Sequence, residues 1–197
     1  MLNREVRIMN EATQVLRQEH EVILGVLDAT NNIAESLESG SDVSPQILSD
    51  IVEFLRLFAD RQHHGKEEDL LFPELEKQGM PRDGGPVGMM LMEHQFGRSL
   101  IARMAEAGKA YESGSRDAGA QWADAAFDYV SLLRDHIAKE NNILFVMAER
   151  ILIPADQQRL LLSFQGVDKE KIGKAEGERL LALEENIQEQ ANALAKS

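Results

Sequence analysis

The residues of this chain best suited to chemistry are its five histidines, since the sequence contains no cysteine. Two of them stand four residues before a glutamate, His63 before Glu67 and His136 before Glu140. Residues i and i+4 share one face of an α-helix, so each pair would present an imidazole beside a carboxylate. Together these two groups suit iron, manganese, zinc or copper. The spacing therefore predicts a metal ion or a metal pair held between helices.

A local repeat surrounds the two pairs. When the Leu-Leu-Phe after the first pattern is aligned with the Ile-Leu-Phe after the second, both patterns read His-x-x-Lys-Glu in register. The alignment selects His63 with Glu67 as the primary pair over the adjacent His64 with Glu68. We interpret the repeat as local similarity rather than a duplication, because the preceding segments do not align.

The composition narrows the classes of function. The absence of cysteine excludes disulfides, thiolate zinc sites, iron–sulfur clusters and cysteine nucleophiles. Acidic residues number 34 against 21 basic ones, which gives a formal net charge of −13. So acidic a surface repels phosphate groups, and we therefore expect neither a nucleic-acid partner nor an anionic membrane partner.

Charged residues interrupt the N-terminal segment at Arg4, Glu5, Arg7 and Glu11, so no apolar signal-peptide core is recognised there. No uncharged apolar stretch approaches the roughly 18 residues that a membrane-spanning helix needs. We expect a soluble, cytoplasmic protein.

Glycine, proline and serine divide the chain into long segments of helical periodicity. The sequence predicts four helices, over about 3–39, 44–77, 87–112 and 117–153. Ser44 is the predicted N-cap of the second helix. The fourth helix has the clearest apolar stripe. Its members are Tyr129, Leu132, Leu133, His136, Glu140, Ile143, Leu144, Met147 and Ile151. Four helices with short connections predict an all-α fold, an antiparallel up-down-up-down four-helix bundle.

A C-terminal helical extension follows Pro154. We predict a bundle domain over 1–153 and an extension over 154–197, the latter with a short helix near 160–164 and a longer one over 168–195. The extension is expected to pack on the bundle or on a partner, and the longer helix is a candidate surface for a homodimer.

The histidines fall on all four predicted bundle helices. His20 lies on the first, His63 and His64 on the second, His94 on the third and His136 on the fourth. A single helical histidine is usually an ordinary core or surface residue, and His-x-x-x-Glu also arises by chance. A distribution over every bundle helix, and none elsewhere, favours a shared site.

With these motifs, residues 10–150 resemble the hemerythrin-like (HHE) cation-binding domain family. The resemblance depends on Glu19-His20, on His-His-Gly-Lys-Glu-Glu-Asp-Leu-Leu-Phe-Pro at 63–73, on Glu93-His94 and on His-Ile-Ala-Lys-Glu-Asn-Asn-Ile-Leu-Phe at 136–145. It implies a four-helix bundle that holds two iron ions, bridged by an oxo or hydroxo group and by two carboxylates. The implied bridging carboxylates are Glu67 and Glu140, and the implied histidine ligands are His20, His63, His94 and His136. His64 is a further candidate ligand, and the alternative is a histidine outside the ligand set. Glu68 is an alternative candidate, as a hydrogen-bond acceptor for a ligand ring.

Two departures separate the chain from the oxygen-carrying hemerythrins. Met90 stands where those proteins have a further histidine, and the fourth-helix pair is spaced His-x-x-x-Glu instead of His-x-x-x-x-Asp. The resemblance therefore favours the HHE branch, which includes iron-sensing domains. The residue types alone leave zinc and manganese open as the metal.

The resulting functional hypothesis is a non-haem di-iron protein that binds or reacts with dioxygen, nitric oxide or peroxide, in sensing or in protection against oxidative or nitrosative stress. Two alternatives are an iron storage or buffering protein and a helical interaction module. The sequence shows no catalytic triad or substrate motif and so assigns no particular reaction.

Overall fold

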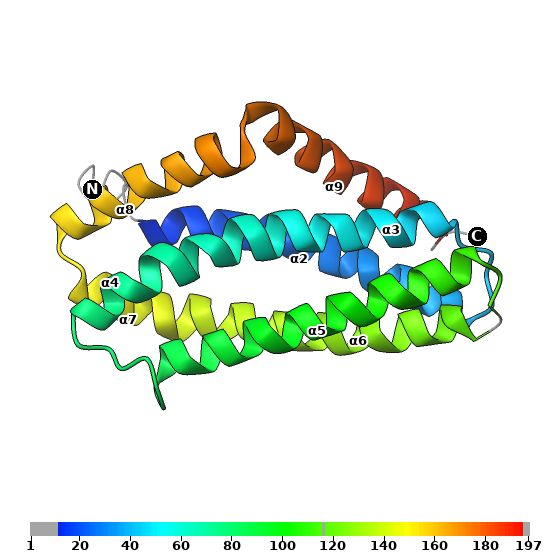
Figure 1. Cartoon of the computed structure of the whole chain (residues 1–197), viewed down its shortest axis with the longest axis horizontal. Helices are drawn as coiled ribbons and strands as arrows, with labels where there is room; N and C mark the ends of the chain where they lie inside the picture. The colour runs from blue at the N-terminus through cyan, green and yellow to red at the C-terminus, as the bar shows by residue number, and fades with distance from the viewer. Residues whose placement is uncertain (1–11, 116, 195–197) are drawn as a thin grey trace.

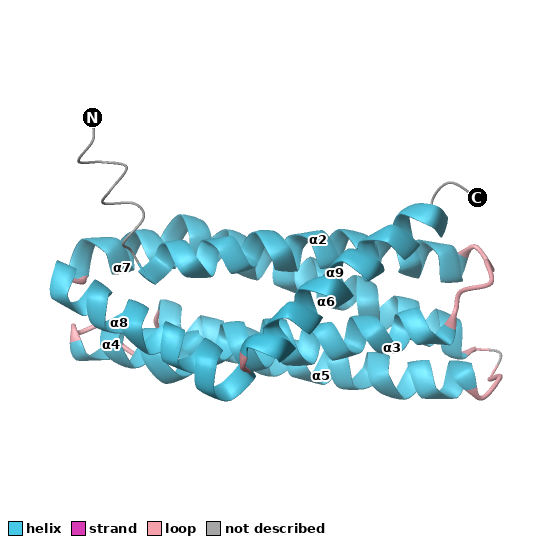
Figure 2. Cartoon of the chain, turned by 90° about the horizontal axis from the view of Figure 1, so that it is seen from above, coloured by secondary structure: helices cyan, strands magenta, loops and turns pink. Residues whose placement is uncertain are grey.

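The computed structural model describes residues 12–115 and 117–194, and every regular element within them is helical. Figures 1 and 2 show long helical rods lying side by side, with the last two helices forming an arch across them. The predicted all-α fold is therefore confirmed. The expected start of the first helix at Asn3 and the extension's last residues, 195–197, lie outside the described residues.

Four rods make up the body of the molecule. The first is α2 (Ala12–Glu38), and the third is α5 (Pro86–Glu112). The second rod runs through α3 (Pro45–Phe54), η1 (Leu55–His64), η2 (Glu67–Leu71) and α4 (Phe72–Lys77). The fourth runs through α6 (Ala118–Lys139), η3 (Glu140–Leu144) and α7 (Phe145–Ile151). Figure 1 places the connections between successive rods at alternate ends of the molecule.

The rod ends follow from local chemistry. The Ser44 side chain accepts a hydrogen bond from the Gln46 backbone N–H at 3.3 Å, which caps α3 as predicted. The second rod ends just before Gly79, whose φ of 95° lies in the left-handed region that glycine adopts without strain. Pro86 occupies the first turn of α5, where its missing N–H costs nothing.

Three of these segments, η1, η2 and η3, have π-helical hydrogen bonding, in which each N–H bonds five residues back and a turn holds one extra residue. They lie at predicted ligands: η1 ends at His63 and His64, η2 begins at Glu67, and η3 begins at Glu140. Widened turns of this kind are frequent at functional sites.

The predicted apolar stripe of the fourth rod is confirmed at Leu144 but wrong at Ile143 and Met147. Ile143 is 53% exposed and Met147 37% exposed, whereas Leu144 and Phe145 are buried. The extra residue in η3 rotates the following helix relative to an uninterrupted α-helix. A constant helical period therefore placed Ile143 and Met147 in the interior, where the structure has Phe145 and Ala148 beside Leu144.

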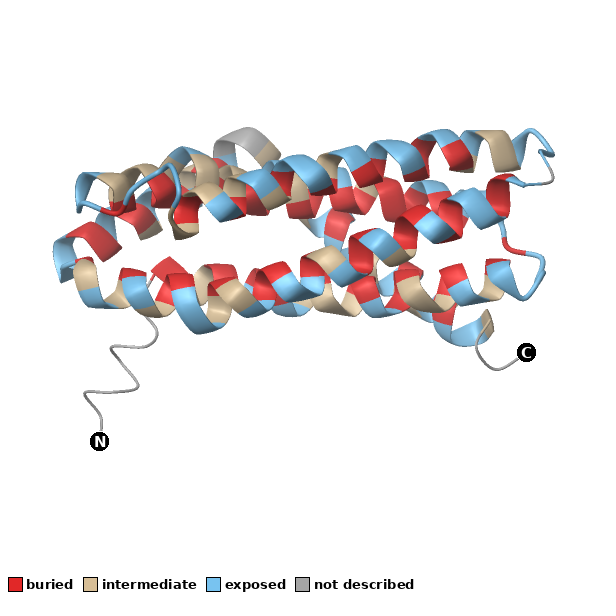
Figure 3. Ribbon diagram, turned by 90° about the horizontal axis from the view of Figure 1, so that it is seen from below, coloured by how far each residue is buried: buried red, intermediate tan, exposed pale blue. Residues whose placement is uncertain are grey.

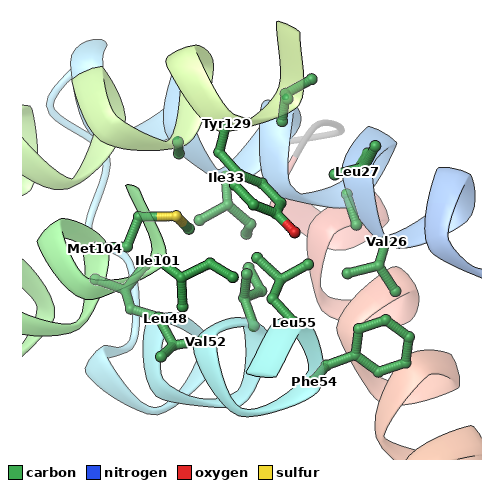
Figure 4. Packing of buried hydrophobic residues seen from close by; sticks show 14 of the residues in the cluster. Val26, Leu27, Ile33, Leu48, Val52, Phe54, Leu55, Ile101, Met104 and Tyr129 are labelled. Carbon is green, nitrogen blue, oxygen red and sulfur yellow. The ribbon is translucent and has the colours of Figure 1, made fainter. Parts of the chain in front are cut away.

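Two clusters of buried apolar residues fill the interior, and a polar layer separates them. Figure 4 shows the larger cluster, which includes Leu55 and Tyr129, and Figure 3 shows how the buried residues gather on the facing sides of the rods. Along α2, Leu16 belongs to the smaller cluster and Ile23 to the larger. Between them lies His20, a predicted ligand.

The extension comprises α8 (Pro154–Val167), η4 (Asp168–Ile172) and α9 (Lys174–Leu194). The helix predicted over 168–195 is confirmed over Lys174–Leu194, but Gly173, with a φ of 80°, separates its first turn as η4. Both helices share the interior of the bundle: α8 contributes Leu160 and Phe164 to the smaller cluster, and α9 contributes Leu180, Ile187 and Ala191 to the larger. In the part of the chain that the structure describes, no helix is long and apolar enough to cross a membrane.

Candidate metal centre

All seven predicted ligand residues converge in the polar layer between the two apolar clusters. Each is almost completely buried, with at most 4% of its surface exposed. Every rod contributes: α2 supplies His20; η1 and η2 supply His63, His64 and Glu67; α5 supplies His94; and α6 and η3 supply His136 and Glu140. The layer thus joins helices that are far apart in the sequence.

The ligand atoms form two groups that share Glu67. Donor group 1 consists of His20, His63, Glu67 and Glu140, and donor group 2 consists of His64, Glu67, His94 and His136. Within each group, one ligand atom from each residue lies within 4.8 Å of the others. The structure therefore brings together all the residues that the sequence singled out as ligands, including His64.

Glu67 faces both groups with different oxygens. Its Oε1 lies 3.6 Å from Nε2 of His63, and its Oε2 lies 3.5 Å from Nε2 of His94. Such a carboxylate can place one oxygen on each of two neighbouring cations.

Glu140 also stands between the groups. Its Oε2 lies 3.1 Å from Nε2 of His20 and 3.3 Å from Nε2 of His136. The Nε2 atoms of His94 and His136 are themselves only 3.1 Å apart. The inner nitrogens and the two carboxylates therefore crowd around a common centre.

All five histidines place Nδ1 beside a polar partner, and His20, His63, His94 and His136 turn Nε2 towards the inner carboxylates. The pairs are His20 with Asn141 (2.9 Å), His63 with Glu19 (3.0 Å), His64 with Asp60 (3.4 Å), His94 with Glu68 (2.7 Å) and His136 with Glu93 (2.9 Å). An oxygen acceptor holds the proton on Nδ1 and leaves the Nε2 lone pair free for a cation. The arrangement is the one that metal-ligating histidines adopt.

A model of the hemerythrin HHE cation-binding domain matches residues 11–148, well over half of the chain and all seven residues of the two donor groups. The chain belongs to this family. Its HHE domain ends before α8, so the helical extension lies outside the family match.

Similar proteins occur in mycobacteria. Uncharacterized proteins of Mycobacterium bovis and Mycobacterium tuberculosis are each 24% identical to this chain over 167 residues, which cover 83% of it. The chain spans 64% of the length of these curated relatives. No solved structure gives a significant match.

Sequence reasoning missed most of the outer partners of the HHE histidines, although it considered Glu68. Glu19 and Glu93, each directly before a histidine of its own helix, accept instead from histidines of the next rod. Each also pairs with a lysine, Glu19 with Lys66 and Glu93 with Lys139. The signal was present in the sequence as a second repeat: Glu-His on the first and third helices matches His-x-x-Lys-Glu on the second and fourth.

Arg98 links the outer partners of donor group 2. It donates to Oδ1 of Asp60 at 2.8 Å and to Oε1 of Glu68 at 2.7 Å, and these carboxylates hold His64 and His94. Burial acts to raise the pKa of Asp60, but hydrogen bonds from His64 and Arg98 outweigh it and lower the pKa to about 2. The acceptor for His64 is therefore a carboxylate at neutral pH.

The inner carboxylates have unequal electrostatic surroundings. Burial, reinforced by the neighbouring Glu140, raises the pKa of Glu67 well above its usual value. Burial acts in the same direction on Glu140, but His136 and His20 outweigh it and hold its pKa well below the usual range. Because Glu67 lacks such compensation, the centre favours a positive charge beside it.

The residues present fit a metal centre. Both oxygens of Glu67 and of Glu140 are buried and accept no hydrogen bond of ordinary geometry from the described residues, and the same holds for Nε2 of His20 and His63. Burying such groups without partners costs about 1–3 kcal/mol each, and more where they are charged. Cations bound to both donor groups would satisfy them together.

Proposed function

We propose that this chain is a non-haem di-iron protein that binds or reacts with dioxygen, nitric oxide or peroxide, within an up-down-up-down HHE bundle. Its role would be sensing, or protection against oxidative or nitrosative stress. The observation that carries the proposal is the pair of donor groups that share Glu67, together with the family membership.

The donor chemistry supports iron. Imidazole and carboxylate without thiolate suit iron, and they also suit manganese or zinc. An iron pair, when bound, would supply Lewis-acidic, redox-active positions for a small ligand. The protein's own part is to fix the five ring orientations through the Nδ1 partners and to exclude bulk water with the apolar clusters on both sides.

The test combines metal analysis with visible spectroscopy on protein loaded with Fe²⁺. We expect about two irons per chain and a spectrum that changes on addition of dioxygen, nitric oxide or peroxide. The variant His20→Ala should lose iron from donor group 1, and Glu76→Gln, at a half-buried position that pairs with Arg82 and contacts no ligand, serves as the matched control. Iron content well below one per chain, or a spectrum indifferent to all three ligands, would refute the proposal. Release of iron to a chelator on reduction, with no reaction toward any ligand, would favour iron buffering.

A further inference from the structure

The C-terminal extension reaches donor group 1 through a chain of charged side chains. Oδ1 of Asp168, the first residue of η4, lies 2.6 Å from Nζ of Lys66. Lys66 is completely buried, and its Nζ also pairs with Oε1 of Glu19. The other Glu19 oxygen accepts from Nδ1 of His63 at 3.0 Å. A continuous path therefore leads from the extension to a ring of donor group 1.

Lys66 depends on both of its carboxylate partners because its ammonium group has no access to solvent. An isolated buried charge is expensive, and removal of one partner from a buried ion pair is strongly destabilising. Asp168 is itself fixed by a hydrogen bond from Nε2 of Gln62 at 3.1 Å, and the Phe164 ring lies 6.0 Å from Nζ of Lys66. The extension thus supplies both a charge and an apolar cover for this lysine.

The corresponding lysine on the other side of the centre has a different environment. Lys139 pairs with Glu93, which accepts from His136 of donor group 2, but its side chain is 37% exposed. Water can therefore solvate Lys139, whereas Lys66 relies on Asp168. The two lysines occupy matching positions of the local sequence repeat, but only Lys66 depends on a residue of the extension.

We propose that Asp168 is a positioning residue for donor group 1. By holding Lys66 against Glu19 it keeps the His63 ring oriented, so that metal retention in this group depends on a segment beyond the HHE domain. The inference rests on the proposed function only in requiring that the two donor groups bind metal.

The experiment measures metal release from the full chain loaded with Co²⁺, whose visible absorption reports on its ligands. Excess chelator is added and the loss of absorption is followed in time. Glu19→Gln and Glu93→Gln assign the release phases to donor groups 1 and 2. Asp168→Asn tests the inference, and Asp168→Glu tests rescue by a retained carboxylate.

The matched control is Glu53→Gln. Glu53 pairs with Arg179 at 3.0 Å and so also joins the bundle to the extension, but both side chains are exposed and the contact leads to no ligand. Circular dichroism and urea unfolding of each variant show whether it is folded before release is measured.

We expect Asp168→Asn to accelerate the Glu19-sensitive phase about tenfold, the lower end of the usual loss when an outer partner of a ligand is removed, and to leave the other phase unchanged. Added to Glu19→Gln it should have little further effect, because both act through one path. Equal acceleration of both phases, an equal effect of Glu53→Gln, full additivity or no acceleration would overturn the inference. Normal Co²⁺ binding by a protein whose iron form ignores all three small ligands would refute the proposed function alone.

Discussion

At the scale of single residues, the centre is built so that the Nδ1 atoms face outer partners and the inner side carries ring nitrogens and carboxylate oxygens. Each of the five Nδ1 atoms lies beside an oxygen on the outside, and the inner face retains nitrogens and carboxylate oxygens that the described residues leave without ordinary hydrogen bonds. Such a centre binds cations well and is poorly suited to the metal-free state. Stability and metal binding should therefore respond differently to one substitution.

Glu67→Gln should separate the two properties. The amide has nearly the shape of the carboxyl group but carries no charge, so we expect the metal-free variant to be at least as stable as the metal-free wild type. Metal should then lose much of its stabilising effect, which in the wild type is about 2.7 kcal/mol at a metal concentration 100 times Kd. Urea unfolding with and without Co²⁺ measures both quantities. A clearly destabilised metal-free variant, or unchanged metal-dependent stabilisation, would contradict the expectation.

Metal binding should release a proton at neutral pH. Burial alone would lower the pKa of His136, but Glu140 and Glu93 outweigh it and raise the pKa to about 9. His136 in the metal-free chain is therefore protonated at pH 7, and a cation must displace that proton. The apparent affinity for Co²⁺ should increase with pH up to about 9.

Calorimetry in two buffers of different ionisation enthalpy detects the released proton directly. His136→Gln, measured in the same buffers, is the control, because it removes the titrating ring. Identical binding enthalpies for the wild type in both buffers would show that no proton leaves.

At the scale of elements, the π-helical turn η3 sets which of its own side chains face the interior. Leu144 is buried, while its neighbour Ile143 is 53% exposed. Leu144→Ala should therefore cost about 2–5 kcal/mol of unfolding free energy. Ile143→Ala should stay within about 0.5 kcal/mol of the wild type. Denaturant unfolding of the two variants tests this contrast, and equal costs would place the register of η3 in error.

The same turn explains what sequence could and could not predict. The helices, the Ser44 cap and the two His-x-x-x-Glu pairs followed from periodicity, turn residues and motif spacing, because these depend on residues near one another in the chain. His20, His64 and His94 were added to the candidate ligands by the family resemblance. The exposure of Ile143 and Met147 did not follow, since a widened turn is invisible to a constant helical period. The Nδ1 partners Glu19, Asp60 and Glu93 were missed because each was read on its own helix, while two of them serve a ring on the next rod.

At the scale of the whole molecule, the extension is part of the packed structure. Leu180 and Ile187 of α9 are completely buried in the larger apolar cluster. Close contact continues at Gly25 of α2, where a Cβ atom would lie 2.4 Å from Nε2 of Gln188. Its arrangement was not predictable from sequence because the break at Gly173 left open where α9 would pack.

Ile187→Ala provides a whole-molecule comparison with the Asp168 variants. Loss of this buried side chain should cost about 2–5 kcal/mol of unfolding free energy. Because α9 carries no member of the Lys66 path, Co²⁺ release from the folded variant should keep wild-type rates. Unfolding and release are measured on the same preparation, with the exposed Leu181→Ala as control. Faster release from donor group 1 would indicate that any loosening of the extension disturbs the centre.

The division of ligands among the rods also bears on how the protein matures. Donor group 1 needs the first, second and fourth rods, and donor group 2 needs the second, third and fourth. Neither the first pair of rods nor the last pair can complete a group, so full coordination becomes available only after both pairs have docked. We therefore expect metal capture to be a late step in biogenesis, with little uptake by a newly made chain that has not assembled.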